Sequence, residues 1–168
     1  MKQINPADAF SKYQPKNITF VISVDKQGKP NGMIAAWHTI LSKEPPMMGV
    51  AVYKVQNTHK LIEQSKEFVL AIPSGRLLKA ITIFGEYHGD KIDKFKMSKV
   101  KTKKARHIKS PLLADATINF ECKVVKQIST GDHTFFIGKV VAAYFNDNQK
   151  IILSSGRDKN GKRTFCKL

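Results

Sequence analysis

The sequence of 168 residues is poor in several features from which function is often inferred. It has two cysteines, Cys122 and Cys166, which lie far apart and form neither a metal-ligand spacing nor a Cys-x-x-Cys redox motif. No apolar run is long enough to span a bilayer, and the first residues lack the apolar centre of a signal peptide. We therefore expect a cytoplasmic protein without a disulfide, a metal centre or a membrane span.

Sequence motifs of common enzyme classes are also missing. There is no Walker loop, G-x-G-x-x-G, H-E-x-x-H or G-x-S-x-G pattern. Acidic residues are scarce, with 13 Asp and Glu against 29 Lys and Arg, and they form no convincing acid/base pair. An enzyme of this composition would depend on an organic cofactor for its reactive atoms.

The excess of basic residues gives a net charge of +16 and a pI of about 9.9. Such a charge favours anionic partners, which include nucleic acid, phosphorylated cofactors and anionic membrane surfaces. The densest basic segment is 91–109, which is typical of a solvated face or loop. Phe95 and Met97 indicate that this segment is anchored rather than disordered.

The pattern of apolar residues predicts one mostly β domain over 1–168, with a few short helices. The chain is 42% hydrophobic and 25% charged, and its length is enough to bury a full core. Strands are predicted over 17–24, 67–73, 116–126 and 133–145, the last two forming a long hairpin. Short helices are predicted over 6–11, over 58–66 with Asn57 or Thr58 as N-cap, and after a cap at Ser74. The tail from Ser154 is rich in glycine and charge. Many strands and few helices favour a barrel.

The stretch 32–52 is the centre of this pattern. Two apolar runs flank a Ser-Lys-Glu-Pro-Pro break, which ends one predicted strand and begins the next. Small residues in the first run allow something flat to approach the backbone, and Trp37, His38 and Thr39 add stacking and hydrogen bonds. From spacing alone, a core strand whose Trp fills the interior is the more common interpretation.

Three further segments contain candidate site residues. The residues Asn57, Thr58, His59 and Lys60 open a predicted helix, where backbone N–H groups favour an anion; a plain N-cap is the alternative. Lys91 follows a Gly-Asp turn and would face an electron-rich ring or a phosphate. His133 stands at the mouth of the long hairpin, as a turn residue or as a site histidine.

Together, these pieces resemble the flavin reductase-like, FMN-binding split-barrel family, and most closely its flavoredoxin branch. The match covers roughly residues 15 to 145. Five pieces occur in the family's order: NGMIAAWHT (31–39) with Ser42 and Pro45-Pro46, NTHK (57–60), EFVLAIP (67–73), GDKIDKF (89–95) and GDHTFFIGKV (131–140).

The resemblance implies a split β-barrel homodimer with one FMN per subunit near the interface. The isoalloxazine edge would be lined by Ala36, Trp37, His38, Thr39, Ile40 and Leu41, chiefly through backbone groups. The ribityl phosphate would be surrounded by Ser42, Asn57, Thr58 and His59. Lys91 would reach the flavin from its loop, and His133 would be the catalytic residue, lying where a nicotinamide donor approaches. No metal ligand is implied.

The implied function is a flavin-dependent oxidoreductase that passes electrons from NADH, NADPH or a redox protein through FMN to an acceptor. A second interpretation is a non-catalytic, flavoredoxin-type electron carrier that docks an acidic partner through 91–109. A third is a basic barrel that binds nucleic acid, for which the sequence lacks a stripe of exposed aromatics. The sequence leaves open the donor, the acceptor, FMN against FAD, and whether the flavin is a prosthetic group or a substrate.

Overall fold

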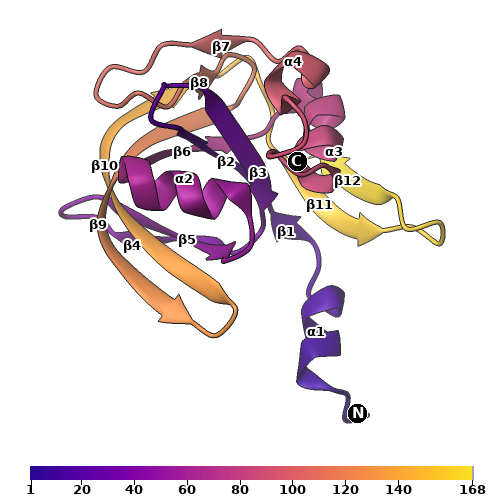
Figure 1. Ribbon diagram of the computed structural model, residues 1–168. Helices are drawn as coiled ribbons and strands as arrows, with labels where there is room; N and C mark the ends of the chain where they lie inside the picture. Colours follow the sequence, from indigo (N-terminus) through magenta and orange to yellow (C-terminus); the bar gives the residue numbers. More distant parts are fainter. Residues whose placement is uncertain (168) are drawn as a thin grey trace.

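A single seven-stranded sheet dominates the computed structural model, which describes residues 1–167 (Figure 1). Every ladder in this sheet is antiparallel. In spatial order the strands are β3 (Pro30–Ala35), β2 (Thr19–Val24), β6 (Glu67–Ile72), β9 (Ile118–Thr130), β10 (His133–Phe145), β5 (Met47–Tyr53) and β4 (His38–Ser42). The predicted mostly β class and the predicted β9–β10 hairpin are confirmed.

The sheet curls because its two outermost strands are consecutive in the chain. Only Ala36 and Trp37 separate β3 from β4, so the two edges of the sheet must approach each other. The carbonyl of Trp37 accepts a hydrogen bond from the N–H of Ala51 in β5, at 2.9 Å. Within the described residues no ladder joins β3 to β4, and the predicted split β-barrel is confirmed.

The first half of the stretch 32–52 differs from its prediction as one strand. The chain turns a corner at Ala36 and Trp37 and forms two strands instead. Ala35 before the corner is buried, whereas Ile40 and Leu41 after it are exposed, yet all three are apolar. The apolar run in the sequence therefore continues across the corner. Periodicity alone therefore gives no sign of the turn.

The barrel interior holds one of two hydrophobic clusters. In β2, Val21 points into the barrel while Phe20 and Ile22 pack in the outer layer, so this strand is buried on both faces. Cys122 belongs to the interior, as predicted, whereas Cys166 is exposed, and both thiols are free. The interior cluster consists of Val21, Ala35, Met48, Val50, Val52, Ile62, Phe68, Leu70, Cys122 and Phe136.

The second cluster lies between the sheet and short helices on its outer face. These helices are η1 (Gly75–Leu77), α3 (Leu78–Glu86) and α4 (Lys94–Ser98). The ring of Phe84 meets those of Phe20 and Phe95 edge-on, each at 5.1 Å between centroids. The predicted cap at Ser74 is confirmed, since its side chain accepts the N–H of Arg76.

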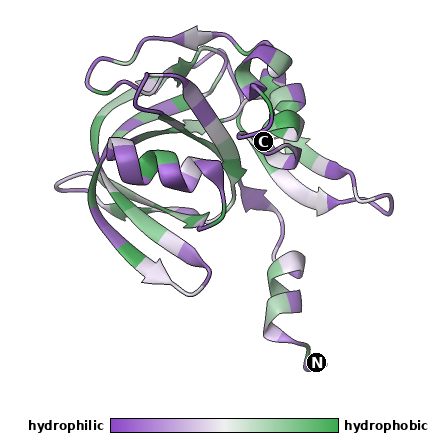
Figure 2. Cartoon of the chain, in the orientation of Figure 1, coloured by the Kyte–Doolittle hydropathy of each residue, from purple (hydrophilic) through white to green (hydrophobic). Residues whose placement is uncertain are grey.

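Helix α2 (Asn57–Ser65) covers one end of the barrel and contacts β2, β3, β5 and β6. Figure 2 shows apolar and polar residues alternating along it, and its apolar side carries Ile62 into the interior. The predicted helix is confirmed, but the predicted N-cap is wrong. Gln56 takes that position in an extended conformation, without a side-chain cap, because Asn57 and Thr58 already belong to the helix.

The chain ends lie outside the barrel. Helix α1 (Pro6–Lys12) has no buried residue and projects from the barrel (Figure 1). Strands β1 (Lys16–Asn17), β11 (Ile152–Arg157) and β12 (Arg163–Lys167) form a separate three-stranded sheet. No helix among the described residues is long and apolar enough to cross a membrane.

The lysine-rich segment is anchored, as predicted. We call residues 99–110 the basic strap; it includes β7 (Thr102–Lys103), which pairs with β8 (Leu112–Leu113). The Glu121 carboxylate accepts the N–H groups of Arg106 and His107, both at 2.8 Å. The Glu67 carboxylate accepts those of Lys109 and Ser110, at 2.7 and 2.8 Å. Two glutamates of the sheet thus hold the backbone of the strap.

Candidate functional site

Aromatic rings gather at the corner between β3 and β4. Trp37 opposes Ala51, and Tyr53 lies two residues further along β5 and so on the same side of the sheet. His133, the first residue of β10, pairs with Tyr53. Its ring lies 4.7 Å from that of Trp37 and 5.3 Å from that of Tyr53, tilted by 40° and 31°. We call these three residues the ring cluster.

The ring cluster is open to solvent. Trp37 is 46% exposed and Tyr53 39%, so this Trp does not fill the barrel interior, against the more common interpretation of its spacing. Phe10 of α1 meets the edge of Trp37 at 6.0 Å between centroids. Exposed, neighbouring aromatic rings provide a surface on which a flat heteroaromatic molecule can stack.

Two charged residues that the sequence analysis did not select adjoin His133. Its Nδ1 lies 2.6 Å from Oδ1 of Asp132. The ammonium of Lys54 donates to the carbonyl of Gly131 at 2.6 Å and to the hydroxyl of Ser129 at 2.8 Å. Among the described residues Lys54 forms no ion pair, so its charge is met by neutral acceptors. Lys54 lies directly after a predicted strand and opposite a predicted hairpin turn, and this position was the signal in the sequence that could have identified it.

The predicted residues at the start of α2 are mostly internal. Thr58 and His59 are 2% and 7% exposed. Nε2 of His59 lies 2.8 Å from the hydroxyl of Thr134, which joins α2 to β10, and Nδ1 lies 3.5 Å from Glu63. Burial lowers the pKa of His59 against the opposing effect of Glu63. The half-buried Asn57 remains for contact with a ligand.

Within residues 1–167 strand β4 is an edge strand that pairs only with β5, so one row of its backbone groups has no strand partner there. Thr39, Ile40 and Leu41 are exposed, and Ser42 is half-buried beyond an irregularity in the ladder. These residues present the free backbone donors and acceptors that the predicted ring edge requires. Ala36 lies half-buried at the corner.

His38 borders an apolar hollow of about 440 Å³ beside β4. Its Nε2 is buried and has no hydrogen-bond partner in the part of the chain that the structure describes. Burial lowers the pKa of this imidazole, while the backbone of Asn17 raises it. The other residues of the hollow are Asn17, Thr39, Ile40, Met48, Ile72, Ile118, Phe120 and Ile151.

Lys91 lies in a turn after α3, where it is exposed and outside the ring cluster. Its neighbour Gly89 lines a hollow of about 180 Å³ together with Asn31, Asn57 and Lys94. Lys94 is 3% exposed, and its ammonium donates to the carbonyls of Gly32 and Phe84 at 2.9 and 3.1 Å. Burial lowers the pKa of Lys94 to about 8, against a smaller effect of Asp90.

The donor set fits a flat heteroaromatic molecule that carries an anionic tail. The ring cluster supplies stacking faces, and the free edge of β4 supplies backbone groups. Nε2 of His38 is a buried polar atom without a hydrogen-bond partner among the described residues. Lys54 and the first residues of α2 supply positive charge and N–H groups for an anion.

A sequence profile for the flavin reductase like domain matches residues 11–161. Among curated proteins, an uncharacterised protein of Archaeoglobus fulgidus is 34% identical over 141 residues, which cover 79% of this chain and 80% of that protein. The ferric-chelate reductase (NAD(P)H) of the same organism is 29% identical over 126 residues, 74% of this chain and 73% of that protein.

Solved structures agree with the fold. The NADH:FAD oxidoreductase of Streptomyces globisporus superposes with a TM-score of 0.85 at 25% identity, covering 100% of this chain and 98% of that one. The flavoredoxin of Methanosarcina acetivorans gives a TM-score of 0.85 at 23% identity, covering 100% and 91%.

Proposed function

The chain belongs to the flavin reductase like domain family, and from this premise we propose that it uses FMN to pass electrons from NADH or NADPH to an acceptor. Membership of this family, with relatives named as reductases, identifies a flavin-dependent oxidoreductase. The single observation that carries the proposal is the ring cluster of Trp37, Tyr53 and His133 beside the free edge of β4.

The residues that would hold the flavin ring follow the corner and β4. Trp37 and Tyr53 offer aromatic faces, and the backbone from Ala36 to Leu41, His38 included, offers hydrogen bonds. Ser42, Asn57, Thr58 and His59 remain the proposed residues for the phosphate side, and Lys91 remains the proposed contact to the flavin from its loop. To these we add Lys54, because its cation has no carboxylate partner among the described residues.

The chemistry that a bound flavin supplies is uptake of two electrons and their return singly or in pairs. The protein's own residues would bind, orient and exchange protons. Backbone N–H groups of the β4 edge would stabilise negative charge on a bound ring. His133 is the proposed catalytic residue, since its imidazole lies within the ring cluster and has one nitrogen that can give or take a proton.

The proposed donor is a reduced nicotinamide. Two relatives carry NADH or NAD(P)H in their names, and neither name decides the donor of this chain. A redox protein is the alternative donor, since a relative of 29% identity is named high molecular weight rubredoxin and this chain covers 54% of it. FMN is preferred to FAD because the resemblance to the flavoredoxin branch implies it.

We propose that the protein acts as a homodimer. Two apolar hollows meet on the β4 side of the barrel and share Ile40, Met48 and Phe120. Ile40 is 75% exposed at their junction, beside the unpaired edge of the sheet. A second copy of the chain would cover this apolar strip and leave the strand edge to the flavin.

One experiment tests the proposed function. Visible spectra of the purified protein are recorded after adding FMN or FAD and dialysis, and again after adding NADH or NADPH under nitrogen. A retained flavin band that either nucleotide bleaches is the expected result. Failure to retain or bind any flavin would overturn the proposal.

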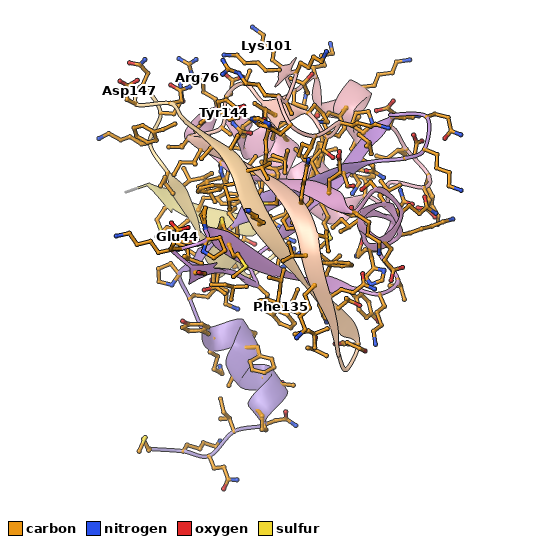
Figure 3. All side chains as sticks on the ribbon, turned by 90° about the vertical axis from the view of Figure 1, so that its left-hand side faces the viewer. Glu44, Arg76, Lys101, Phe135, Tyr144 and Asp147 are labelled. Carbon is orange, nitrogen blue, oxygen red and sulfur yellow. The ribbon has the colours of Figure 1, made fainter. Side chains whose placement is uncertain are left out.

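A second function, electron carriage to an acidic partner, is favoured by the basic strap. Its backbone is fixed by Glu67 and Glu121, yet none of its cationic side chains forms an ion pair among the described residues. Figure 3 places Lys101 of the strap at the end of the molecule opposite to Phe135, which lies near the ring cluster in β10. A retained flavin band that neither nucleotide bleaches would favour this function.

A further inference from the structure

The carboxylate of Asp132 and the imidazole of His133 form a close pair at the turn between β9 and β10. Oδ1 of Asp132 lies 2.6 Å from Nδ1 of His133. The Asp132 side chain is 72% exposed, whereas that of His133 is 18% exposed. One end of the imidazole is thus bound to a carboxylate in solvent, while its ring lies among other side chains.

This geometry determines which ring nitrogen carries the proton. The hydrogen bond from His133 lowers the pKa of the Asp132 carboxyl, so the carboxylate is ionised at neutral pH and can only accept. Two bare acceptors at 2.6 Å would repel each other, so Nδ1 must be protonated. In the neutral ring Nε2 then carries the free lone pair.

The pair is braced by contacts on both sides. The N–H of Lys54 donates to the carbonyl of Asp132 at 3.1 Å, and the hydroxyl of Thr130 donates to the carbonyl of His133 at 3.2 Å. The rings of Trp37 and Tyr53 lie on the imidazole at 4.7 and 5.3 Å. The turn and the ring cluster therefore restrict rotation of the His133 side chain.

We propose that Asp132 is a positioning residue: it holds the proton of His133 on Nδ1 and so reserves Nε2 for proton exchange with a ligand stacked on the ring cluster. The proposal rests on the proposed function only in placing a ligand there. The Nδ1 proton stays in its hydrogen bond, while one proton enters and leaves at Nε2. Neither the family profile nor the named relatives assign a role to Asp132.

The tautomer is measured directly in ¹⁵N-labelled protein without flavin. Long-range ¹H–¹⁵N spectra above the titration range of the imidazoles separate protonated from bare ring nitrogens, and H133Q identifies the signal among the five histidines. The wild type is expected to carry the proton on Nδ1. In D132A this preference is expected to be lost, with Nε2–H becoming a major form.

The matched control is D147A, which removes a carboxylate from another exposed turn and should leave the His133 signal unchanged. A wild-type proton on Nε2, or a D132A spectrum identical to that of the wild type, would overturn the proposal. Because this readout needs no flavin, it stands or fails separately from the proposed function.

A kinetic measurement distinguishes a positioning role of Asp132 from a purely structural one. With bound FMN and reduced nicotinamide, D132A should lower kcat by about tenfold while leaving the Kd for FMN unchanged, because an ill-placed proton exchanger affects the reaction and not binding. A change in FMN affinity with kcat unchanged would contradict the assigned role. Failure of all variants to bind flavin would contradict the proposed function instead.

Discussion

Lys94 is the residue whose protonation most directly affects the packing near the site. Its ammonium is buried against two backbone carbonyls, and among the described residues it has no carboxylate partner. A neutral amine still has two N–H donors for the carbonyls of Gly32 and Phe84. Loss of the charge therefore removes a burial cost without breaking the contacts that hold α4 to β3.

The expected pH dependence follows from its pKa, which falls from 10.5 to about 8 on folding. Between these values the unfolded chain binds more protons, so this group makes the folded state more stable as pH rises. The free energy of unfolding of the wild type should therefore increase relative to K94M as pH rises from about 8 toward 10.5. Urea unfolding of both proteins measures the difference, and a free energy of unfolding of the wild type that stays constant or falls relative to that of K94M over this range would refute the assignment.

Residue patterns predicted the core more fully than the site. Cys122 was assigned to the interior because it lies in an apolar strand, and the alternation of apolar residues along a strand is enough to predict that a side chain is buried. Lys54 and Asp132 were missed because each owes its place to the contact between the end of β5 and the turn from β9 to β10. The position of Lys54 after a predicted strand was the one hint of this contact, since the pairing of β5 with β10 is not a local property. Thr58 and His59 were selected for a ligand, and the structure gives their side chains packing contacts.

At the scale of elements, Gly138 lets β10 approach β9 and the barrel interior. A Cβ at this position would lie 2.7 Å from the ring of Phe68 and 2.8 Å from Cβ of Cys122. G138A should lower the free energy of unfolding by about 1–3 kcal/mol, because a filled core cannot accept another methyl group without strain. Thermal or urea unfolding measures this loss.

A second substitution, F68L, tests the cause of this loss because it makes room beside Gly138. If the clash with the Phe68 ring is the cause, G138A should cost less in the F68L background than in the wild type. Equal costs in both backgrounds would assign the effect to another contact.

The basic strap depends on a buried carboxylate. Glu121 is fully buried and accepts N–H groups of Arg106 and His107 and the hydroxyl of Tyr144. Burial raises the pKa of Glu121, but these hydrogen bonds outweigh it and hold the pKa below its usual value of 4.5. Its contribution to stability is therefore present above pH 4.5 and is lost as pH falls through the lower folded value.

E121Q should release the strap. The amide has one acceptor oxygen in place of two, so one of the N–H groups of Arg106 and His107 loses its partner, and the strap should exchange with solvent at least tenfold faster, as a loss of about 1.4 kcal/mol implies. Hydrogen exchange with mass spectrometry checks this, with the exposed Glu86 changed in E86Q as control. Unchanged protection of the strap in E121Q would contradict its anchoring role.

Elements were predicted better than their connections. The strands of the long hairpin and helix α2 follow from alternation and helical spacing, which are local properties. The corner at Ala36 and the β11–β12 hairpin were not predicted. The β11–β12 hairpin pairs with β1, which lies near the other end of the chain. Its sequence is rich in glycine and charge and has no strand pattern.

At the scale of the whole molecule, the exposed strip beside β4 predicts self-association. I40D should convert a dimer into a monomer, because a carboxylate would be buried at the junction of the two apolar hollows. Light scattering after size exclusion measures the mass. The control is V55D, since Val55 is 70% exposed and lies outside both hollows. A monomeric wild type, or a dimeric I40D, would contradict the proposed interface.

The most direct test of the account is the affinity for FMN of the wild type, W37A and F145A, measured by fluorescence titration after any bound flavin is removed. Phe145 is a matched aromatic, 71% exposed and outside the ring cluster. Loss of stacking costs about 1–3 kcal/mol, so W37A should raise the Kd by about five- to a hundredfold while F145A leaves it unchanged. Equal affinities of W37A and the wild type would show that the ring cluster does not hold the flavin.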